Sequence, residues 1–552
     1  MNRPLAVAIV WHMHQPYYRH PQTSEVVLPW VRLHAAKDYL HMARLLHEFP
    51  NLKVNLTLVP ALHDQLEEVA RGEDDVDARL TMRAGEGGLT DEERVHLMRR
   101  FFSISHQQVV NRIPDYHRLL DLRLAAGDRP DLLSSGYFRD LAGWFNLAWI
   151  DPELLAIDER LLRLRDRGRN FTRDDLQYIV ARQRNMASGV VRLYHRLQKA
   201  GQVEVVTVPA YHPILPLLID TDVARRSDPN AILPDPAFRW PQDAAAHLDD
   251  AVSQYERVFD RRPTGIWPSE GAVSPEAADA IARVGLRWFA TDEGVLSRSI
   301  GADIWRDEIG ALTDPALLYR PYRLPNGVVA IFRDRELSDR IGFAYGHMRP
   351  EDAVGEMIGR LARARERLAD DGQPYLASII LDGENAWEGY NNNGNDFLRA
   401  LYGALSSDAR FTTVRVTDFL EQNPARVELP NLHSGSWIDA NFRVWIGEEM
   451  HARAWSALAR TREFAHEQWG DLGEMPANVA RALMVAEGSD WFWWYSSRNS
   501  SPEDLVFDEL FRANLEVVWW WGGQEPPAEL RQPLTAPQAA PVGGAMLPGR
   551  TG

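Results

Sequence analysis

The stretch TGIWPSEGAVSPEAADAIARVGLRWFATDE, residues 264–293, carries the pattern that decides the fold. Two short apolar segments, each ending in polar residues, flank a segment with helical periodicity. Ser274 and Pro275 predict the start of this helix, because serine caps a first turn and proline fits its first position. Gly285 predicts its end. Strand, helix and strand in this order indicate a βαβ unit with two parallel strands.

The same alternation recurs along the first 390 residues. Near-continuous apolar runs rich in valine and isoleucine are typical of parallel strands that are buried on both faces. Seven segments have this character: 5–14, 53–60, 203–212, 264–270, 286–293, 328–336 and 376–384. We therefore predict the α/β class and a (β/α)7 barrel over residues 1–390. The stretch from about 62 to 200 is too long for one crossover, so we expect a helical insertion there.

Beyond residue 390 the strand pattern fades and helical periodicity dominates. We predict a C-terminal helical bundle over residues 391–522 that completes a cleft on the barrel. The last stretch, 523–552, is rich in proline, alanine and glycine and has little to bury. We expect it to be a disordered tail.

Composition excludes several kinds of function. A formal net charge of −17 argues against nucleic acid or an anionic membrane as the partner. The chain has no cysteine, which excludes disulfides, thiolate nucleophiles and cysteine-ligated metals. The apolar run near the N-terminus, about eight residues, is too short to span a membrane, so we expect a cytoplasmic protein. The oligomeric state stays open.

Acids and histidines gather where the predicted strands end, which is the functional edge of an α/β barrel. These residues are His12, His14, His212, Glu270, Asp292, Glu293, Asp334, Asp382 and Glu384. Phosphate-binding glycine loops and a GxSxG nucleophile motif are absent from the sequence. Paired carboxylates with aromatic neighbours suit the hydrolysis of glycosidic bonds, in which one acid attacks and the other protonates the leaving oxygen.

Five motifs, in order, resemble those of glycoside hydrolase family 57: HMHQPYY (12–18), GQVEVVTVPAYHPILP (201–216), GIWPSEGAVS (265–274), AIFRDRELSDRIGF (330–343) and ILDGENAW (380–387). This family comprises mainly α-glucan-active amylases, amylopullulanases, glucanotransferases and branching enzymes. The resemblance extends over about residues 5–515 and implies a seven-stranded barrel followed by a helical bundle. Segments 434–438 and 446–455 also look like family segments that bring the bundle up to the cleft. Segment 489–504 resembles the tryptophan-rich segment of the family, but residues 496–499 read Ser-Ser-Arg-Asn where relatives often have Gly-Asp-Asp-His.

The resemblance implies that Glu270 is the nucleophile, with Trp267 beside it, and that Asp334 is the general acid/base. A retaining mechanism then places the two carboxyl groups ~5–5.5 Å apart. Asp339, later in the same motif, is expected to be a salt-bridge partner of Arg333 or Arg335. Asp292 and Glu293 are expected to support the site rather than to touch the substrate.

His12 and His14 face the same way on a strand, because side chains alternate with a period of two. Such a pair could ligate a metal, whereas the resemblance implies that both histidines contact sugar hydroxyls, and His212 likewise. Asp382 and Glu384 are candidates for binding sugar hydroxyls, for orienting the acid or for scaffold hydrogen bonds. Trp387 could stack on a sugar or pack between barrel and bundle.

The sequence therefore predicts a retaining α-glucan hydrolase that resembles amylopullulanases and α-amylases, with α-1,4 links as substrate and α-1,6 links as an open extension. Its expected partner is an α-glucan or maltooligosaccharide, and no cofactor or metal is expected. The main alternative is a 4-α-glucanotransferase or branching-type transglycosylase. A metal-dependent enzyme similar to mannosidases or deacetylases would use His12, His14 and an aspartate. A non-catalytic carbohydrate-binding protein ranks lowest, because Glu270 and Asp334 are both present.

Overall fold

The computed structural model describes residues 3–384 and 386–535. Within these residues, seven parallel strands form a ring, as predicted from the apolar runs. They are β1 (Leu5–His12), β2 (Val54–Thr57), β3 (Val203–Val206), β4 (Gly265–Ile266), β5 (Trp288–Asp292), β7 (Val329–Arg333) and β8 (Leu376–Asp382). Their side chains are almost all buried, because helices cover the outer face and the barrel interior is filled.

Backbone pairing follows the ring in the order β1, β2, β3, β4, β5, β7, β8 and back to β1. Two of the joins are single bridges: Thr207 lies opposite Ile266 between β3 and β4, and Arg333 lies opposite Ser378 between β7 and β8. The barrel is therefore nearly closed, which confirms the predicted (β/α)7 fold. Three short strands extend the sheet: β6 (Tyr322–Arg323), β9 (Phe411–Thr413) and β10 (Val427–Glu428).

The helix between β4 and β5 begins as predicted: Ser274 Oγ accepts a hydrogen bond from Ala277 N at 3.2 Å, and Pro275 is its first residue.

Within the described residues, no helix combines the length and the apolar character needed to cross a bilayer. The helices of the barrel are α1 (Trp30–His34), a π-helical turn (Ala35–Tyr39), α2 (Leu40–Leu45), α11 (Leu215–Ile219), α12 (Ala224–Ser227), α13 (Pro241–Phe259), α14 (Pro275–Arg283), α15 (Glu293–Ile300), α16 (Pro315–Tyr319), α17 (Arg335–Phe343), α18 (Pro350–Arg367), α19 (Asn395–Ser407) and α20 (Val416–Gln422).

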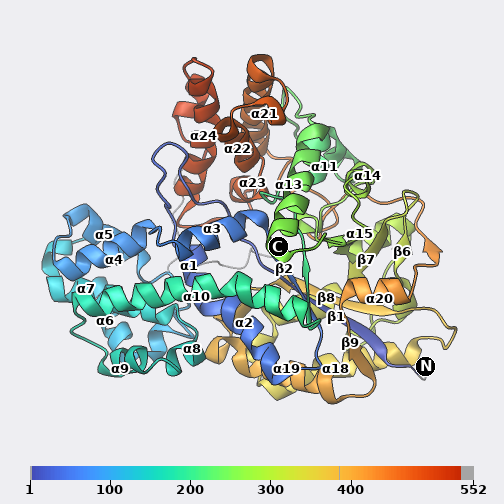
Figure 1. Cartoon of the computed structure of the whole chain (residues 1–552), viewed down its shortest axis with the longest axis horizontal. Helices are drawn as coiled ribbons and strands as arrows, with labels where there is room; N and C mark the ends of the chain where they lie inside the picture. The colour runs from blue at the N-terminus through green and yellow to red at the C-terminus, as the bar shows by residue number, and fades with distance from the viewer. Residues whose placement is uncertain (1–2, 385, 536–552) are drawn as a thin grey trace.

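The long stretch between β2 and β3 is helical and lies to one side of the barrel (Figure 1). Its last helix is held at its start by a capping box, in which Thr172 and Asp175 each accept a hydrogen bond from the other's backbone N–H. The helices of this insertion are α3 (Pro60–Ala70), α4 (Val76–Glu86), α5 (Asp91–Arg100), α6 (Pro114–Ala126), α7 (Ser135–Ala148), α8 (Pro152–Ala156), α9 (Glu159–Arg167) and α10 (Arg173–Lys199).

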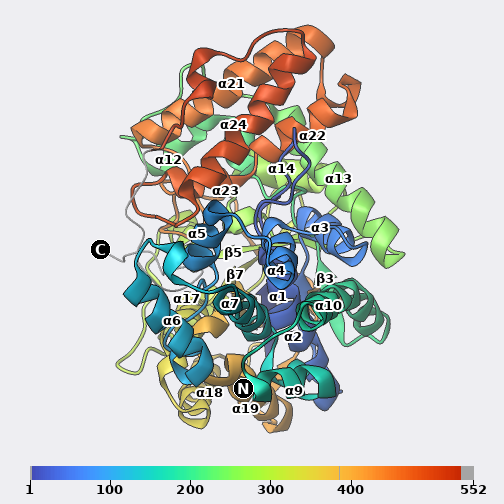
Figure 2. The same cartoon turned by 90° about the vertical axis from the view of Figure 1, so that its left-hand side faces the viewer.

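A helical bundle stands at one end of the barrel (Figures 1 and 2). It consists of α21 (Glu449–Trp469), α22 (Ala477–Ala486), α23 (Ser489–Tyr495) and α24 (Asp504–Trp521). The predicted start of the bundle at residue 391 is too early, because α19 packs on α18 and the strand after it, β9, pairs with β1. The chain therefore completes the barrel before it enters the bundle.

The first part of the predicted tail, residues 523–535, includes a segment that packs on the bundle. Residues Ala528–Arg531 form a helical turn on α24, and Leu530 and Leu534 are 1% and 4% exposed. Arg512 of α24 donates to the carbonyl of Leu530 at 2.9 Å. Composition alone did not reveal these two leucines, which bury apolar surface against the bundle. Residues 536–552 lie outside the described part of the chain.

Candidate active site

Glu270 lies directly beyond β4, in a helical turn formed by Ser269–Gly271. Its φ of 59° is in the left-handed region, which residues other than glycine rarely adopt. Backbone hydrogen bonds hold the turn: Gly271 N donates to Pro268 O at 2.8 Å, and Trp437 N donates to Glu270 O at 3.0 Å. The strained turn presents the carboxylate at the carboxyl end of the barrel.

The side chain of Glu270 meets the segment that leads into the bundle. Its Oε2 accepts a hydrogen bond from the indole Nε1 of Trp437 at 2.7 Å, and Oε1 lies 3.9 Å from Nδ1 of His212. Burial raises the pKa of Glu270 well above its usual value, and the charges of Asp382 and Asp490 raise it further. The Trp437 hydrogen bond opposes this rise because it stabilises the charged form.

His12 and His212 are buried beside this carboxylate. Their Nε2 atoms are 3.1 Å apart, and Nδ1 of His12 lies 2.7 Å from Oγ1 of Thr57. Burial lowers the pKa of both imidazoles well below the usual value, and the neighbouring His14 lowers it further. Both rings are therefore neutral near pH 7, when each can donate one hydrogen bond and accept another.

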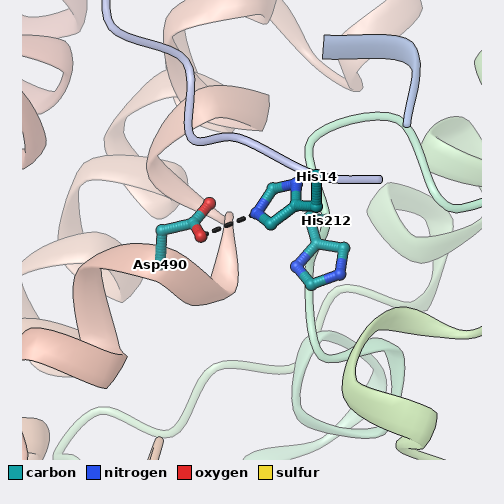
Figure 3. A group of neighbouring side chains, drawn as sticks. All are labelled: His14, His212 and Asp490. Carbon is teal, nitrogen blue, oxygen red and sulfur yellow. Dashed lines mark hydrogen bonds and ion pairs between the residues drawn. The ribbon is translucent and has the colours of Figure 1, made fainter. Parts of the chain in front are cut away.

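His14 stacks on His212, with ring centroids 3.8 Å apart and planes inclined by 18°. Its Nε2 lies 2.7 Å from Oδ1 of Asp490, which α23 of the bundle supplies (Figure 3). The preceding residue, Ser489, places its hydroxyl 3.0 Å from Nδ1 of His212. Barrel and bundle thus build one polar cluster together.

Asp382 is the last residue of β8, and Glu384 lies two residues beyond it. Asp382 is opposite His12 in the pairing of β8 with β1, so it lies on the same rim as the histidines. Glu384 is 3% exposed, and its Oε1 accepts hydrogen bonds from His14 N (3.2 Å), Gln15 Nε2 (3.2 Å) and the hydroxyl of Tyr39 (3.0 Å). Glu384 therefore holds the HMHQ motif in place through hydrogen bonds. This is the scaffold role, one of the three roles considered for it.

Three residues of the cluster, Trp437, Ser489 and Asp490, are absent from the residues predicted for the site. The sequence holds a partial signal for them, since segment 434–438 was expected to approach the cleft and segment 489–504 resembles a tryptophan-rich segment of the family. Which side chains would point inward depends on contacts between residues 167–476 positions apart, which no local pattern encodes.

The sequence model of glycosyl hydrolase family 57 matches residues 8–431. The chain belongs to this family. A curated relative, the 1,4-alpha-glucan branching enzyme TK1436 of Thermococcus kodakarensis, is 26% identical over 175 residues. That match covers 29% of this chain and about a quarter, 23%, of the relative.

Solved structures of family 57 enzymes share the fold at low sequence identity. The crystal structure of TK1436 from Thermococcus kodakaraensis superposes with a TM-score of 0.58 and 15% identity, covering 93% of this chain and 89% of that one. The α-amylase AmyC of Thermotoga maritima gives a TM-score of 0.56 and 15% identity, with 96% of each chain covered. The 4-alpha-glucanotransferase of Thermococcus litoralis gives 0.51 and 14%, covering 94% of this chain and 60% of that one.

Asp334, expected from the family resemblance to be the acid/base, is engaged elsewhere. Its Oδ1 lies 2.9 Å from Nη2 of Arg306, its Oδ2 accepts from the hydroxyl of Tyr319 at 2.9 Å, and it caps α17 through Leu337 N. It is 2% exposed. The acids whose charges act on Glu270 are Asp382 and Asp490. Both oxygens of Asp334 are thus engaged, whereas burial raises its pKa in the direction that a general acid requires, so its role as acid/base stays a prediction.

The other acids near Asp334 behave as predicted. Asp339 forms an ion pair with Arg333. Asp292 pairs with Arg333 and Arg335, and Glu293 accepts from Arg306 Nη1 at 2.7 Å. These pairs support the barrel rim beside β5 and β7.

Two tryptophans expected to touch substrate are buried. Trp387 is 1% exposed, donates its indole N–H to Gly383 O at 2.7 Å and packs edge-on against Trp11. It belongs to the core, which corrects the prediction of a sugar-binding role. Trp267 is also 1% exposed, but it packs edge-on against Trp437, with ring centroids 5.2 Å apart, and so forms the floor under Glu270 and Trp437.

His14, His212 and Asp490 bring potential ligand atoms within 4.8 Å of one another, which raises the metal alternative again. Zinc needs ligand lone pairs that converge on one point at about 2.0–2.2 Å. The two imidazoles stack face to face, so their in-plane lone pairs lie in two nearly parallel planes. One ion could not meet both without a rotated ring, and the cluster fits hydrogen bonding better than metal binding.

Proposed function

We propose that this family 57 enzyme cleaves α-glucosidic bonds in α-glucans with retention, with Glu270 as nucleophile and Asp382 as general acid/base. One observation carries the proposal: Asp382 shares the rim with Glu270, in register with His12, which meets His212 next to Glu270. Asp334, the acid/base that the family resemblance implies, is the competing assignment, and azide rescue distinguishes the two.

The proposed division of labour follows from electrostatics. Two facing carboxyl groups in a buried site repel each other, which favours a state with one proton between them. The indole N–H of Trp437 stabilises the charged form of Glu270. In the proposed mechanism Glu270 reacts in this charged form, and Asp382 supplies the proton to the leaving oxygen.

In the first step a carboxylate oxygen of Glu270 attacks the anomeric carbon, the glycosidic C–O bond breaks, and the proton of Asp382 passes to the leaving oxygen. In the second step Asp382 takes a proton from the acceptor hydroxyl, and the acceptor oxygen displaces Glu270. We propose that the partly exposed His14 and Asp490 hydrogen-bond sugar hydroxyls beside the attacked carbon, and that neutral His12 and His212, buried behind them, orient this polar wall.

The acceptor decides between hydrolysis and transfer. The WPSEG and LDGENAW motifs favour an amylopullulanase-like or α-amylase-like hydrolase with water as acceptor. Transglycosylation is a second candidate, because structures similar to this one include branching enzymes and a glucanotransferase by name. Incubation with maltoheptaose separates them: hydrolysis gives shorter sugars alone, whereas transfer also gives products longer than maltoheptaose.

Azide rescue tests the two catalytic residues separately. With α-glucosyl fluoride as substrate, Glu270→Ala plus azide should form β-glucosyl azide, since azide replaces the nucleophile and inverts the centre once. Asp382→Ala plus azide should form α-glucosyl azide, because azide then intercepts the glucosyl enzyme. If Asp334→Ala gives the α-azide and Asp382→Ala does not, the assignment of Asp382 is wrong.

A further inference from the structure

A second cluster of ionisable residues lies between the barrel and the bundle, outside the group of residues that meets Glu270. It consists of Asp243 and His247 of α13, Arg462 of α21 and Glu487 directly after α22; we refer to these four residues as the clamp. All four are 0% exposed. Arg462 holds Asp243 with two contacts, Nε to Oδ2 at 2.6 Å and Nη2 to Oδ1 at 3.0 Å, and His247 Nε2 lies 2.9 Å from Glu487 Oε2.

The clamp holds one proton on its two carboxyl groups, in addition to the protons of neutral His247 and cationic Arg462. Tyr211 N donates to Nδ1 of His247 at 3.4 Å, so the ring is neutral and its Nε2–H donates to Glu487. The charge of Glu487 raises the pKa of Asp243, so we infer that the two carboxyl groups hold one proton between them. Burial raises the pKa of both carboxyl groups, to about 8 for Asp243 and about 7 for Glu487. The protonated clamp therefore balances one carboxylate against the Arg462 cation.

Two further charges face this cluster. Asp471 lies 3.7 Å from Nη2 of Arg462, and the charge of Asp250 acts on His247. Arg462 also lies over the ring of Trp240, 3.9 Å from its centroid. Asp471 adds negative charge near Arg462, and Asp250 adds it near His247. When the shared proton is lost, Asp243 and Glu487 are both charged, and Arg462 balances only one of them.

The clamp continues directly into the site from both sides. On the bundle side, Gly488 follows Glu487, and a Cβ there would come within 2.8 Å of Tyr211 O. Ser489 N donates to His212 O at 3.0 Å, and the serine hydroxyl meets the His212 ring. On the barrel side, Ala210 N donates to His247 O at 3.2 Å. Segments 487–490 and 210–212 are thus fixed against each other at the point where the clamp joins them.

We propose that Glu487 is a positioning residue: through His247 and Asp243 it fixes the turn 487–490 on the loop 210–212, and so places Ser489 against His212 and Asp490 against His14. The inference rests on the proposed function only in taking these histidines as sugar-binding groups. Deprotonation of the clamp loosens this contact and weakens substrate binding.

Binding measurements in an Asp382→Asn background test the proposal without interference from the catalytic acid. Affinity for maltoheptaose, measured by calorimetry at pH 6 and pH 9, should fall at least fivefold in the parent. Adding Glu487→Gln should remove most of this fall, because the amide accepts from His247 and donates to Asp243 without a titrating proton. An unchanged pH dependence in Glu487→Gln would overturn the proposal.

Steady-state kinetics provide a second test of the proposal. Glu487→Ala should raise KM for maltooligosaccharides at least tenfold at pH 6, and Glu487→Gln should restore it to within twofold of the unmodified enzyme. Asp75→Asn is the matched control, since it also removes the carboxylate of a buried arginine pair (Arg32 Nε to Asp75 Oδ2, 2.7 Å) but lies in the insertion. A KM in Glu487→Ala no higher than in Asp75→Asn would assign Glu487 a purely structural role.

Thermal unfolding tests the clamp independently of the proposed function. It also applies if Glu487→Ala does not fold, because it uses only the unmodified enzyme and Glu487→Gln. Melting temperatures of the unmodified enzyme and Glu487→Gln should diverge between pH 6 and pH 9, with the unmodified enzyme losing more. If no variant binds maltoheptaose while this divergence persists, the substrate assignment fails and the clamp stands. If the melting curves shift in parallel, the clamp fails.

Discussion

The indole N–H of Trp437 donates a 2.7 Å hydrogen bond to Oε2 of Glu270 and so joins the segment leading to the bundle to the proposed nucleophile. Arg333 lies over the same indole ring, 5.1 Å from its centroid. Trp437 thus acts on the carboxylate through one directed bond, held in place by a cation–π contact and by Trp267 below it.

Trp437→Phe keeps most of the ring and removes this bond. Because the bond stabilises the ionised form, its loss raises the pKa of Glu270, and the acidic limb of the kcat/KM profile moves to higher pH. We expect a loss of about 10-fold in kcat/KM at neutral pH, equivalent to about 1.4 kcal/mol. Trp445→Phe is the control, since the Trp445 indole N–H has no hydrogen-bond partner within the described residues. An unshifted acidic limb in Trp437→Phe would contradict the assignment.

The variant Asp334→Asn distinguishes a structural role of Asp334 from a catalytic one. Removing one charge from a buried arginine pair typically costs about 3–5 kcal/mol, so we expect a clearly lower free energy of unfolding. Activity per folded molecule should stay within about tenfold, whereas Asp382→Asn should lose at least about 10²-fold in kcat. Urea unfolding and kcat measured together check this. Asp339→Asn, from a half-exposed pair in the same motif, should change stability by less than about 1 kcal/mol.

These acids show what the sequence could and could not predict. Apolar runs and helix caps were sufficient for the strands, their order along the chain and the rim on which the acids lie. Asp334 and Asp382 both follow such strands, and nothing local tells them apart. The difference arises from the loop that brings Arg306 onto Asp334, and that contact depends on tertiary packing.

Acidic conditions should destabilise the fold through the neutral histidines. The pKa values of His12 and His212 are lowered in the folded state, so the unfolded chain binds more protons below about pH 6.5. Their contribution is fully present above that pH and is lost as the pH falls, with a slope approaching about 2.7 kcal/mol per pH unit for two groups. Urea unfolding between pH 7 and pH 5 measures it. His12→Gln should reduce the slope by about half, and exposed His117→Gln should leave it unchanged; equal slopes would refute this account.

Two leucines near the C-terminus are expected to stabilise the bundle. Deletion of 525–552 removes two buried leucines, Leu530 and Leu534, and should lower the free energy of unfolding by about 3–5 kcal/mol. Leu530→Ala with Leu534→Ala in the full-length chain should reproduce most of that loss. A deletion that leaves the melting temperature unchanged would show that the burial of these leucines contributes nothing to stability.

The same limit of local patterns applies to Trp387. A tryptophan beside a strand-end acid fits a sugar platform as well as it fits a core, and only the packing of Trp11 and Gly394 against its ring decides. Burial in a chain with 19 tryptophans is therefore poorly predicted residue by residue, although the overall preference for core positions is sound.

Chelation should leave activity unchanged. The stacked rings of His14 and His212 do not suit a shared ion, so dialysis against EDTA is expected to preserve kcat on maltooligosaccharides. Metal analysis of the dialysed protein provides the control. Loss of activity that stoichiometric zinc restores would favour the metal-dependent alternative.

The contact between His14 and Asp490 spans 476 positions of the chain. At 5–20 residues per second, a ribosome needs roughly 0.5–1.5 minutes to add that many residues after His14 has been synthesised. The barrel can close only after β8 (Leu376–Asp382) has been synthesised, about three-quarters of the way through that interval, and its rim still lacks Ser489 and Asp490 until the bundle emerges. A nascent chain therefore carries a folded barrel without a complete active site, and activity first appears at the end of translation.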